Sequence, residues 1–172
     1  MALPRIGSGP TLRDMADIFF RRAAEADLPA IVALLADDPL GQQREQPGPN
    51  LAQSYRDAFA AIEADPNQLL VVATDGARIV GTLQLSFIPG LSRNGAWRGQ
   101  IEAVRIAADR RSSGLGRRMF DWAIAECRAR GCRLVQLTTD RQRPDAHRFY
   151  EQLGFVASHI GYKLAIAPQQ QD

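Results

Sequence analysis

The 172-residue chain lacks several features that mark whole classes of protein. Its two cysteines and two histidines are too few for a disulfide scaffold or an evident zinc site. Asp, Arg or Gly interrupts each apolar stretch within a few residues, so none approaches the ~18 residues of a membrane span. Hydrophobic residues still make up 45% and charged residues 23%, as in an ordinary globular protein. We therefore expect one folded domain with no metal and no membrane partner.

Lysine is nearly absent, since Lys163 stands against twenty arginines. The net charge is +2, yet the stretch from Arg105 to Arg148 holds eleven arginines and five acids. This excess is either a coding bias on solvated helix faces or an anion site, because clustered Arg attracts phosphate. Nucleic acid is not an expected partner, because the overall charge is small and no basic arm is interleaved with aromatic residues. Cys127 and Cys132 fit ordinary thiols in a reducing compartment.

The N-terminal segment does not resemble a secretory signal, because acidic, Pro and Gly residues interrupt it. We expect residues 1–17 to be a flexible leader, residues 18–167 the domain and residues 168–172 a flexible tail. The expected location is the cytoplasm.

Hydrophobic periodicity predicts a mixed α/β domain. Apolar residues at helical spacing begin at Leu28 after a predicted N-cap at Asp27, and a second stripe starts at Leu51. Two further helices are expected over 113–130 and around 146–153, each followed by a glycine. Strands are expected over 19–23, 69–74, 78–87, 97–107, 134–138, 155–157 and 160–166. The connection between the strands at 97–107 and 134–138 should be a right-handed parallel crossover.

The most informative segment runs from Val104 to Arg117, where a strand leads into a loop and then a helix. The loop carries Arg, Ser and two glycines, and the helix N-terminus presents unpaired N–H groups and a partial positive charge. Together these features predict an anion site. A P-loop is excluded because Arg117 stands where Lys is required, and Met119 replaces the third glycine of a dinucleotide fingerprint. The alternative is a tight strand–helix connection without a ligand.

Two motifs resemble one family. Arg111-Ser112-Ser113-Gly114-Leu115-Gly116 resembles the R/Q-x-x-G-x-G/A motif of the GNAT (GCN5-related) N-acetyltransferases, and Ala146-His147-Arg148-Phe149-Tyr150-Glu151-Gln152-Leu153-Gly154-Phe155 resembles their A-x-x-F-Y-x-x-x-G-F segment. The resemblance implies a mixed, mostly antiparallel sheet with one parallel splayed strand pair, flanked by helices. It also implies an acetyl-CoA-dependent, bacterial-type N-acetyltransferase, often a homodimer.

The resemblance also assigns cofactor contacts. Pantetheine is expected along Val104, Arg105 and Ile106, with a backbone N–H near Val104 polarising the thioester carbonyl. The pyrophosphate is expected on Arg111, Ser112, Ser113, Gly114, Leu115, Gly116 and Arg117. The chain departs from the family pattern at Arg143, where many members have Asn; Arg143 is expected to reach a phosphate or the substrate instead.

The chemistry implied is attack of a neutral amine on a thioester. Glu102 is the candidate base, because strict strand alternation would place it on one face with Val104 and Ile106. Its alternative is a surface acid or a partner of a nearby Arg. Tyr150 occupies the position of the family's frequent general acid, and its alternative is a core tyrosine.

The acceptor is expected to be the primary amine of a small molecule. The predicted acceptor site lies between the loop 38–50, the second helix and the loop 89–97. Its candidate residues are Arg44, Tyr55, Arg93 and Trp97. Arg44 or Arg93 would hold a carboxylate of the acceptor, and each could equally be a solvated loop charge. Two other functions stay open: an acyl-CoA-binding or interaction module, and acetylation of protein N-termini or lysines.

Overall fold

The computed structural model describes residues 18–37 and 41–166. The predicted leader and tail, and residues 38–40 of the first long loop, lie outside the described residues. The chain divides into two units, residues 1–137 and 138–172, which are described separately.

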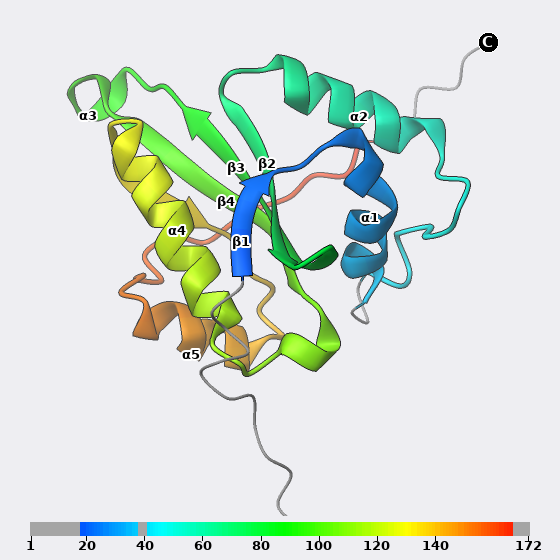
Figure 1. The fold of residues 1–172 in the computed structure, drawn as a ribbon. Coiled ribbons are helices and arrows are strands. Elements are labelled where there is room, and N and C mark those ends of the chain that lie inside the picture. The colour runs from blue at the N-terminus through cyan, green and yellow to red at the C-terminus, as the bar shows by residue number, and fades with distance from the viewer. Residues whose placement is uncertain (1–17, 38–40, 167–172) are drawn as a thin grey trace, which may run out of the picture. The chain divides into compact units, whose positions relative to one another are not determined.

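The first unit is built on a five-stranded sheet in the order β1-β2-β3-β4-β5 (Figure 1). The first four strands are antiparallel neighbours, whereas β4 and β5 are parallel. The bounds are β1 Ile18–Arg22, β2 Gln68–Asp75, β3 Arg78–Ile88, β4 Trp97–Ile106 and β5 Cys132–Leu137. The predicted hairpin at Asp75-Gly76 is present, with Gly76 at φ 56°. The predicted mixed sheet with one parallel pair is therefore confirmed.

Helices cover both faces of this sheet. The bounds are a 3-10 turn η2 Glu25–Asp27, α1 Leu28–Ala36, α2 Gln53–Ala64, a short turn α3 Ser92–Gly95, a 3-10 turn η3 Ala108–Arg110 and α4 Leu115–Ala129. Helix α4 packs on the face where Gly81 and Gly99 leave room for Met119 and Cys127. The opposite face packs Leu70 and Val72 against α1 and α2. No helix within residues 18–37 and 41–166 is both long and apolar enough to cross a membrane.

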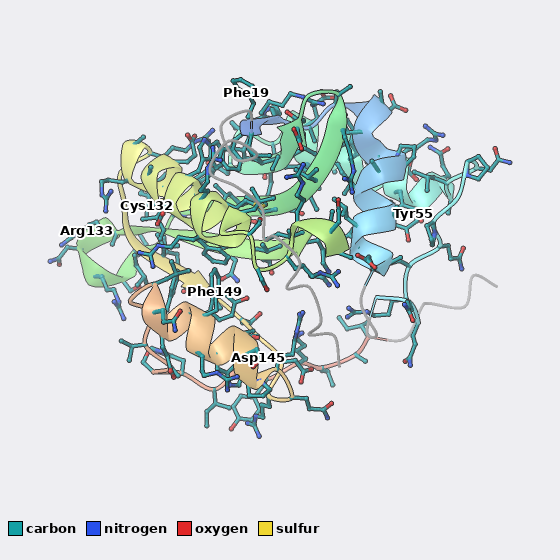
Figure 2. All side chains as sticks on the ribbon, turned by 60° about the horizontal axis from the view of Figure 1, so that its bottom comes forward. Phe19, Tyr55, Cys132, Arg133, Asp145 and Phe149 are labelled. Atoms are coloured by element: carbon teal, nitrogen blue, oxygen red, sulfur yellow. The ribbon has the colours of Figure 1, made fainter. Side chains whose placement is uncertain are left out.

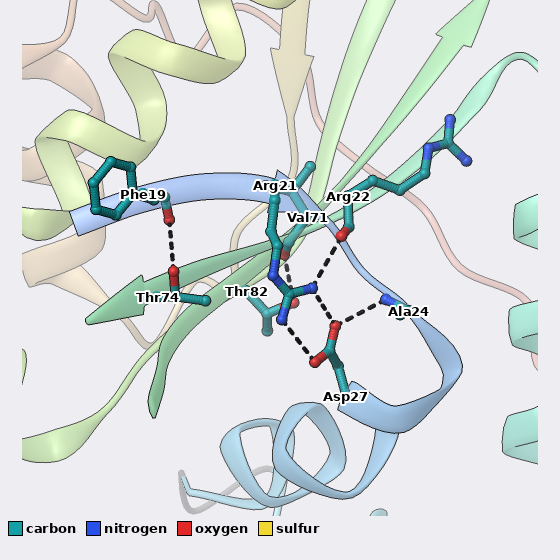
Figure 3. Close-up of polar contacts among 8 residues, drawn as sticks. All are labelled: Phe19, Arg21, Arg22, Ala24, Asp27, Val71, Thr74 and Thr82. Carbon is teal, nitrogen blue, oxygen red and sulfur yellow. Dashed lines mark hydrogen bonds and ion pairs between the residues drawn. The ribbon is translucent and has the colours of Figure 1, made fainter. Parts of the chain in front are cut away.

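Asp27 holds the entry to α1 in a way that the sequence did not predict (Figure 3). Its side chain does not cap α1. Instead it accepts hydrogen bonds from Arg21 Nη1 at 2.6 Å, Arg21 Nη2 at 2.9 Å and the Ala24 N–H at 2.8 Å. The reason is η2: Asp27 ends this extra turn, so its carboxylate reaches back to β1. The Arg21 hydrogen bonds hold the pKa of the Asp27 carboxyl below its usual range.

The second unit contains α5, Pro144–Gln152, at the predicted position, and Gly154 follows it at φ 89°. The strands predicted over 155–157 and 160–166 are wrong: residues 155–166 form no regular element in this structure. Alternating apolar residues give a segment the pattern of a strand. A strand also needs the backbone of a neighbour for its hydrogen bonds, and this segment has no ladder partner among the described residues.

Candidate active site

Strand β4 extends beyond its parallel neighbour. The β4–β5 ladder begins at Trp97↔Cys132 and ends at Ile101↔Leu137, while β4 continues to Ile106. The edge of residues 102–106 that faces away from β3 therefore has no ladder partner in β5. An exposed strand edge of this kind pairs readily with an extended ligand that carries amide groups.

A β-bulge interrupts β4 at the start of this free edge. Glu102 pairs with Gln84 and Arg105 with Thr82, so Ala103 and Val104 both stand opposite the single residue between them, Leu83. Ala103 adopts φ 52°, a left-handed conformation that is unusual for a residue with a Cβ. A bulge of this kind leaves the extra residue outside the regular ladder and re-aims its backbone.

The bulge corrects one prediction about Glu102. Paired residues of an antiparallel ladder share a face, so Glu102 and Arg105 lie with Gln84 and Thr82 on the face of α1 and α2. Val104 and Ile106 lie on the α4 face. The extra residue breaks the alternation that would have placed Glu102 with them, and nothing about an alanine signals such a bulge in a sequence.

Glu102 has an available carboxylate. Its side chain is exposed, and no hydrogen bond or ion pair engages it within residues 18–37 and 41–166. Arg105, on the same face, donates from Nη1 to the Val104 carbonyl at 2.9 Å. A carboxylate held on a rigid strand next to a bulge is well placed to accept a proton.

The predicted anion turn follows β4 directly. Ser112 at φ 60° and Gly114 at φ 88° reverse the chain after η3, and α4 begins at Leu115 rather than at the predicted Ser113. Ser113 Oγ donates to the Arg110 carbonyl at 2.6 Å and accepts from the Leu115 N–H at 3.4 Å. The first-turn N–H groups of Gly116 and Arg117 have no carbonyl one turn earlier in the helix. These donors suit a diphosphate.

The arginines around this turn are largely neutralised by acids from distant segments. Arg110 pairs with Asp75 of β2. Arg111 donates from Nη2 to both the carbonyl and Oδ2 of Asp37, each at 2.7 Å, and thereby ties the turn to the end of α1. Only a 3.8 Å pair with Asp121 engages Arg117 among the described ion pairs. The first-turn N–H groups of α4 and Arg117 are therefore the donors of this turn that other residues engage least, whereas Arg111 has a structural role.

The four predicted acceptor residues come from different elements of the first unit. Tyr55 of α2, labelled in Figure 2, donates its hydroxyl to Glu45 Oε2 at 2.8 Å and accepts from the Gln46 N–H at 3.1 Å, so it anchors the loop that carries Arg44. Arg93 and Trp97 lie at the other end of β4. The strand has ten residues, so Trp97 stands about 30 Å from the anion turn.

The remaining predicted residues lie in the second unit. Tyr150 is half-buried on α5, with its ring centroid 5.6 Å from that of Phe149 and 6.3 Å from that of Phe155. Arg143 precedes Pro144 at the start of α5, and its carbonyl accepts from the N–H groups of Ala146 and His147. These contacts hold the side chain of Tyr150 and the start of α5 within the second unit.

Neither cysteine has the environment of a nucleophile. Cys127 is buried against Gly99, and burial raises its pKa to about 12. Burial also raises the pKa of Cys132, which is labelled in Figure 2. Within the described parts of the chain, no group of three or more His, Cys, Asp or Glu side chains is arranged to hold a metal ion.

Comparison with known proteins decides the family. The model of the acetyltransferase (GNAT) family matches residues 28–155, which include β4, the anion turn and α5. The chain belongs to the GNAT acetyltransferase family. This GNAT protein is 33% identical over 114 residues to the aminoalkylphosphonate N-acetyltransferase of Salmonella typhimurium, a match that covers 66% of this chain and 73% of the relative.

Solved structures of two bacterial proteins share the fold of this chain. A Bacillus halodurans C-125 protein described as a transcriptional regulator is 50% identical, with a TM-score of 0.84, and the match covers 87% of this chain and 99% of that one. An Agrobacterium tumefaciens C58 protein described as a candidate acetyltransferase is 30% identical, with a TM-score of 0.76, and the match covers 86% and 99%. The GNAT protein is thus an N-acetyltransferase with the fold that its motifs indicated, in a family that uses acetyl-CoA.

Proposed function

We propose that this GNAT protein transfers an acetyl group from acetyl-CoA to the primary amine of a small molecule by direct attack of the amine. The observation that carries the proposal is the arrangement along β4: Glu102, the bulge at Ala103, a free strand edge and the anion turn follow one another within a few residues. The relative from Salmonella, named for N-acetylation of aminoalkylphosphonates, supports a small-molecule acceptor.

The donor set of the chain fits acetyl-CoA. The first-turn N–H groups of α4 and Arg117 would hold the pyrophosphate, and the free edge of residues 102–106 would hold the amide-bearing pantetheine arm. When bound, acetyl-CoA supplies the acetyl thioester. A backbone N–H at the bulge, left outside the ladder, would donate to the acyl oxygen.

Two side chains carry the proton transfers in this proposal. Glu102 accepts the proton that the ammonium group of the acceptor must lose, either directly or through one water molecule. The Tyr150 hydroxyl donates a proton to the departing thiolate. Each transfer of this kind is typically worth ~10²–10⁴-fold in rate.

The test is a pair of matched variants, Glu102→Gln and Tyr150→Phe, and their combination. We expect acetyl-CoA to raise the unfolding midpoint of all three variants, while turnover of the double variant falls by at least ~100-fold. Wild-type turnover in the double variant would refute both assignments.

A second candidate function is an acyl-CoA-responsive binding module, which is favoured by the name of the Bacillus relative. It differs from the first in one measurable respect. Such a module binds acetyl-CoA with no release of free thiol in the presence of any amine, and Glu102→Gln leaves its behaviour unchanged.

A further inference from the structure

A row of polar side chains crosses the sheet on the face that carries Glu102. Gln68 of β2, Ser86 of β3, Gln100 of β4 and Gln136 of β5 are successive ladder partners. We call these four residues the polar row. Ser86 is 9% exposed and the three glutamines are half-buried. On the same face Leu70 and Val72 are buried under α1 and α2, so the polar row lies outside that apolar core.

Hydrogen bonds within this face leave the row with donors. Ser86 Oγ donates to Gln68 Oε1 at 2.8 Å, and Gln84 Nε2 donates to the same oxygen at 3.0 Å. Gln136 Nε2 donates to Gln100 Oε1 at 2.7 Å. The side-chain oxygens of Gln68 and Gln100 are thus engaged, whereas no hydrogen bond engages Gln100 Nε2 within residues 18–37 and 41–166. The N–H₂ group of Gln100 is therefore available to a ligand, and a donor of this kind suits an anion.

Two charged residues of opposite sign flank Gln100 along β4. Glu102 lies two residues beyond Gln100 on this face, about 7 Å away along the strand. Arg98 lies two residues before Gln100 on the same face; it forms no ion pair among the described residues, and its buried Nε has no hydrogen-bond partner. Carboxylate, amide and guanidinium therefore follow in order. Such a field favours an acceptor with an amine at one end and an acid at the other.

We propose that the polar row binds the acidic group of the acceptor, so that the substrates are short amines ending in a phosphonate or a similar acid. The inference rests on the proposed function, because it takes Glu102 as the site of the reacting amine. Gln100 is the central residue: it contributes the free amide N–H₂, and the bond from Gln136 holds its side chain in place. Arg98 contributes positive potential behind the row.

Gln100→Glu is the decisive variant. A carboxylate of the same shape still accepts the bond from Gln136, but it removes the N–H₂ donor and repels an anion. The measured quantity is the ratio of kcat/KM for 2-aminoethylphosphonate to that for propylamine. We expect the wild type to prefer the phosphonate and the variant to lose at least about tenfold of this ratio, as for the loss of one hydrogen bond to a charged group. Preference should shift toward 1,3-diaminopropane.

Gln53→Glu is the matched control, because Gln53 lies exposed on α2 and pairs only with Asp57 among the described contacts. Its ratio should equal that of the wild type. A wild type with no preference for the phosphonate, or a Gln100→Glu variant that slows both acceptors equally, would overturn the inference while leaving the acetyltransferase intact.

Binding of 2-aminoethylphosphonate, measured without turnover, distinguishes the proposal for the polar row from the proposed acetyltransferase function. In the presence of coenzyme A, 2-aminoethylphosphonate should raise the unfolding midpoint of the wild type but not of Gln100→Glu. A shift that depends on Gln100, without acetylation of any amine, would sustain the polar row and refute the proposed function. No shift and no acetylation would refute both.

Discussion

Deletion of Ala103 removes the β4 bulge and leaves its surroundings in register. With one residue fewer, Val104 alone would stand opposite Leu83, and the flanking pairs Glu102↔Gln84 and Arg105↔Thr82 would be retained on their present faces. The perturbation is therefore confined to the backbone that the proposed function places beside the acyl group.

The structure sets the magnitude of the effect on stability. A residue with a Cβ in the left-handed region costs roughly 1–2 kcal/mol, and Ala103 sits there at φ 52°. Deletion removes this cost and restores a regular ladder. We expect the free energy of unfolding, measured in urea, to stay unchanged or to rise by about 1–2 kcal/mol.

Activity should move in the opposite direction. Loss of one preorganised backbone donor to an oxyanion typically lowers kcat by ~10²–10³-fold. The assay is release of free coenzyme A thiol with a primary amine. Ala103→Gly is the control: glycine adopts the same φ without strain, so the bulge and the turnover should persist. A deletion variant that folds and turns over like the wild type would refute the role of the bulge, and so would an equal loss in Ala103→Gly.

Three further predictions concern the scaffold. Asp27→Asn should cost about 1.5–3 kcal/mol at pH 7, because it removes the charged partner of Arg21. The lowered pKa of Asp27 means that this contribution is present above the ordinary value of 3.8 and is lost as pH falls through the folded-state pKa, so the difference between wild type and variant, measured in urea, should shrink below about pH 4. Gly99→Ala should destabilise by about 1–3 kcal/mol, because the new Cβ would overlap Cys127 Sγ, and Cys127→Ala should relieve the added cost in a double-mutant cycle; simple additivity would contradict the packing argument. Iodoacetamide at pH 8 should leave Cys127 unmodified until the protein unfolds, and rapid labelling of the folded protein would show that its thiol is not buried.

The sequence predicted correctly those elements that are marked by turn residues at their own ends. The hairpin at Asp75-Gly76 and the ends of α4 and α5, two residues before Gly131 and Gly154, follow from turn residues, and these glycines do adopt positive φ. The turn between β4 and α4 follows for the same reason, because Ser and Gly between a strand and a helix are visible in a sequence. The side-chain alternation of residues 160–166 was also visible, but it predicted strands that need a partner to form.

The active-site details depend on neighbours and were not predictable in this way. The bulge at Ala103 exists because two residues of β4 meet one of β3, so only the register reveals that Glu102 and Val104 face apart. The polar row is assembled from four strands, and each member alone is an ordinary glutamine or serine. The arginine cluster predicted an anion site from local charge, whereas folding brings Asp37 and Asp75 from distant segments to neutralise Arg111 and Arg110.

The central claim is that the chain binds acetyl-CoA at the β4 edge and the anion turn and passes the acetyl group to an amine. The most direct measurement is thermal unfolding with and without acetyl-CoA, followed in the same samples by free-thiol release with a panel of primary amines. We predict a rise in the unfolding midpoint and thiol release with at least one amine. No change in the midpoint at saturating acetyl-CoA would contradict the account.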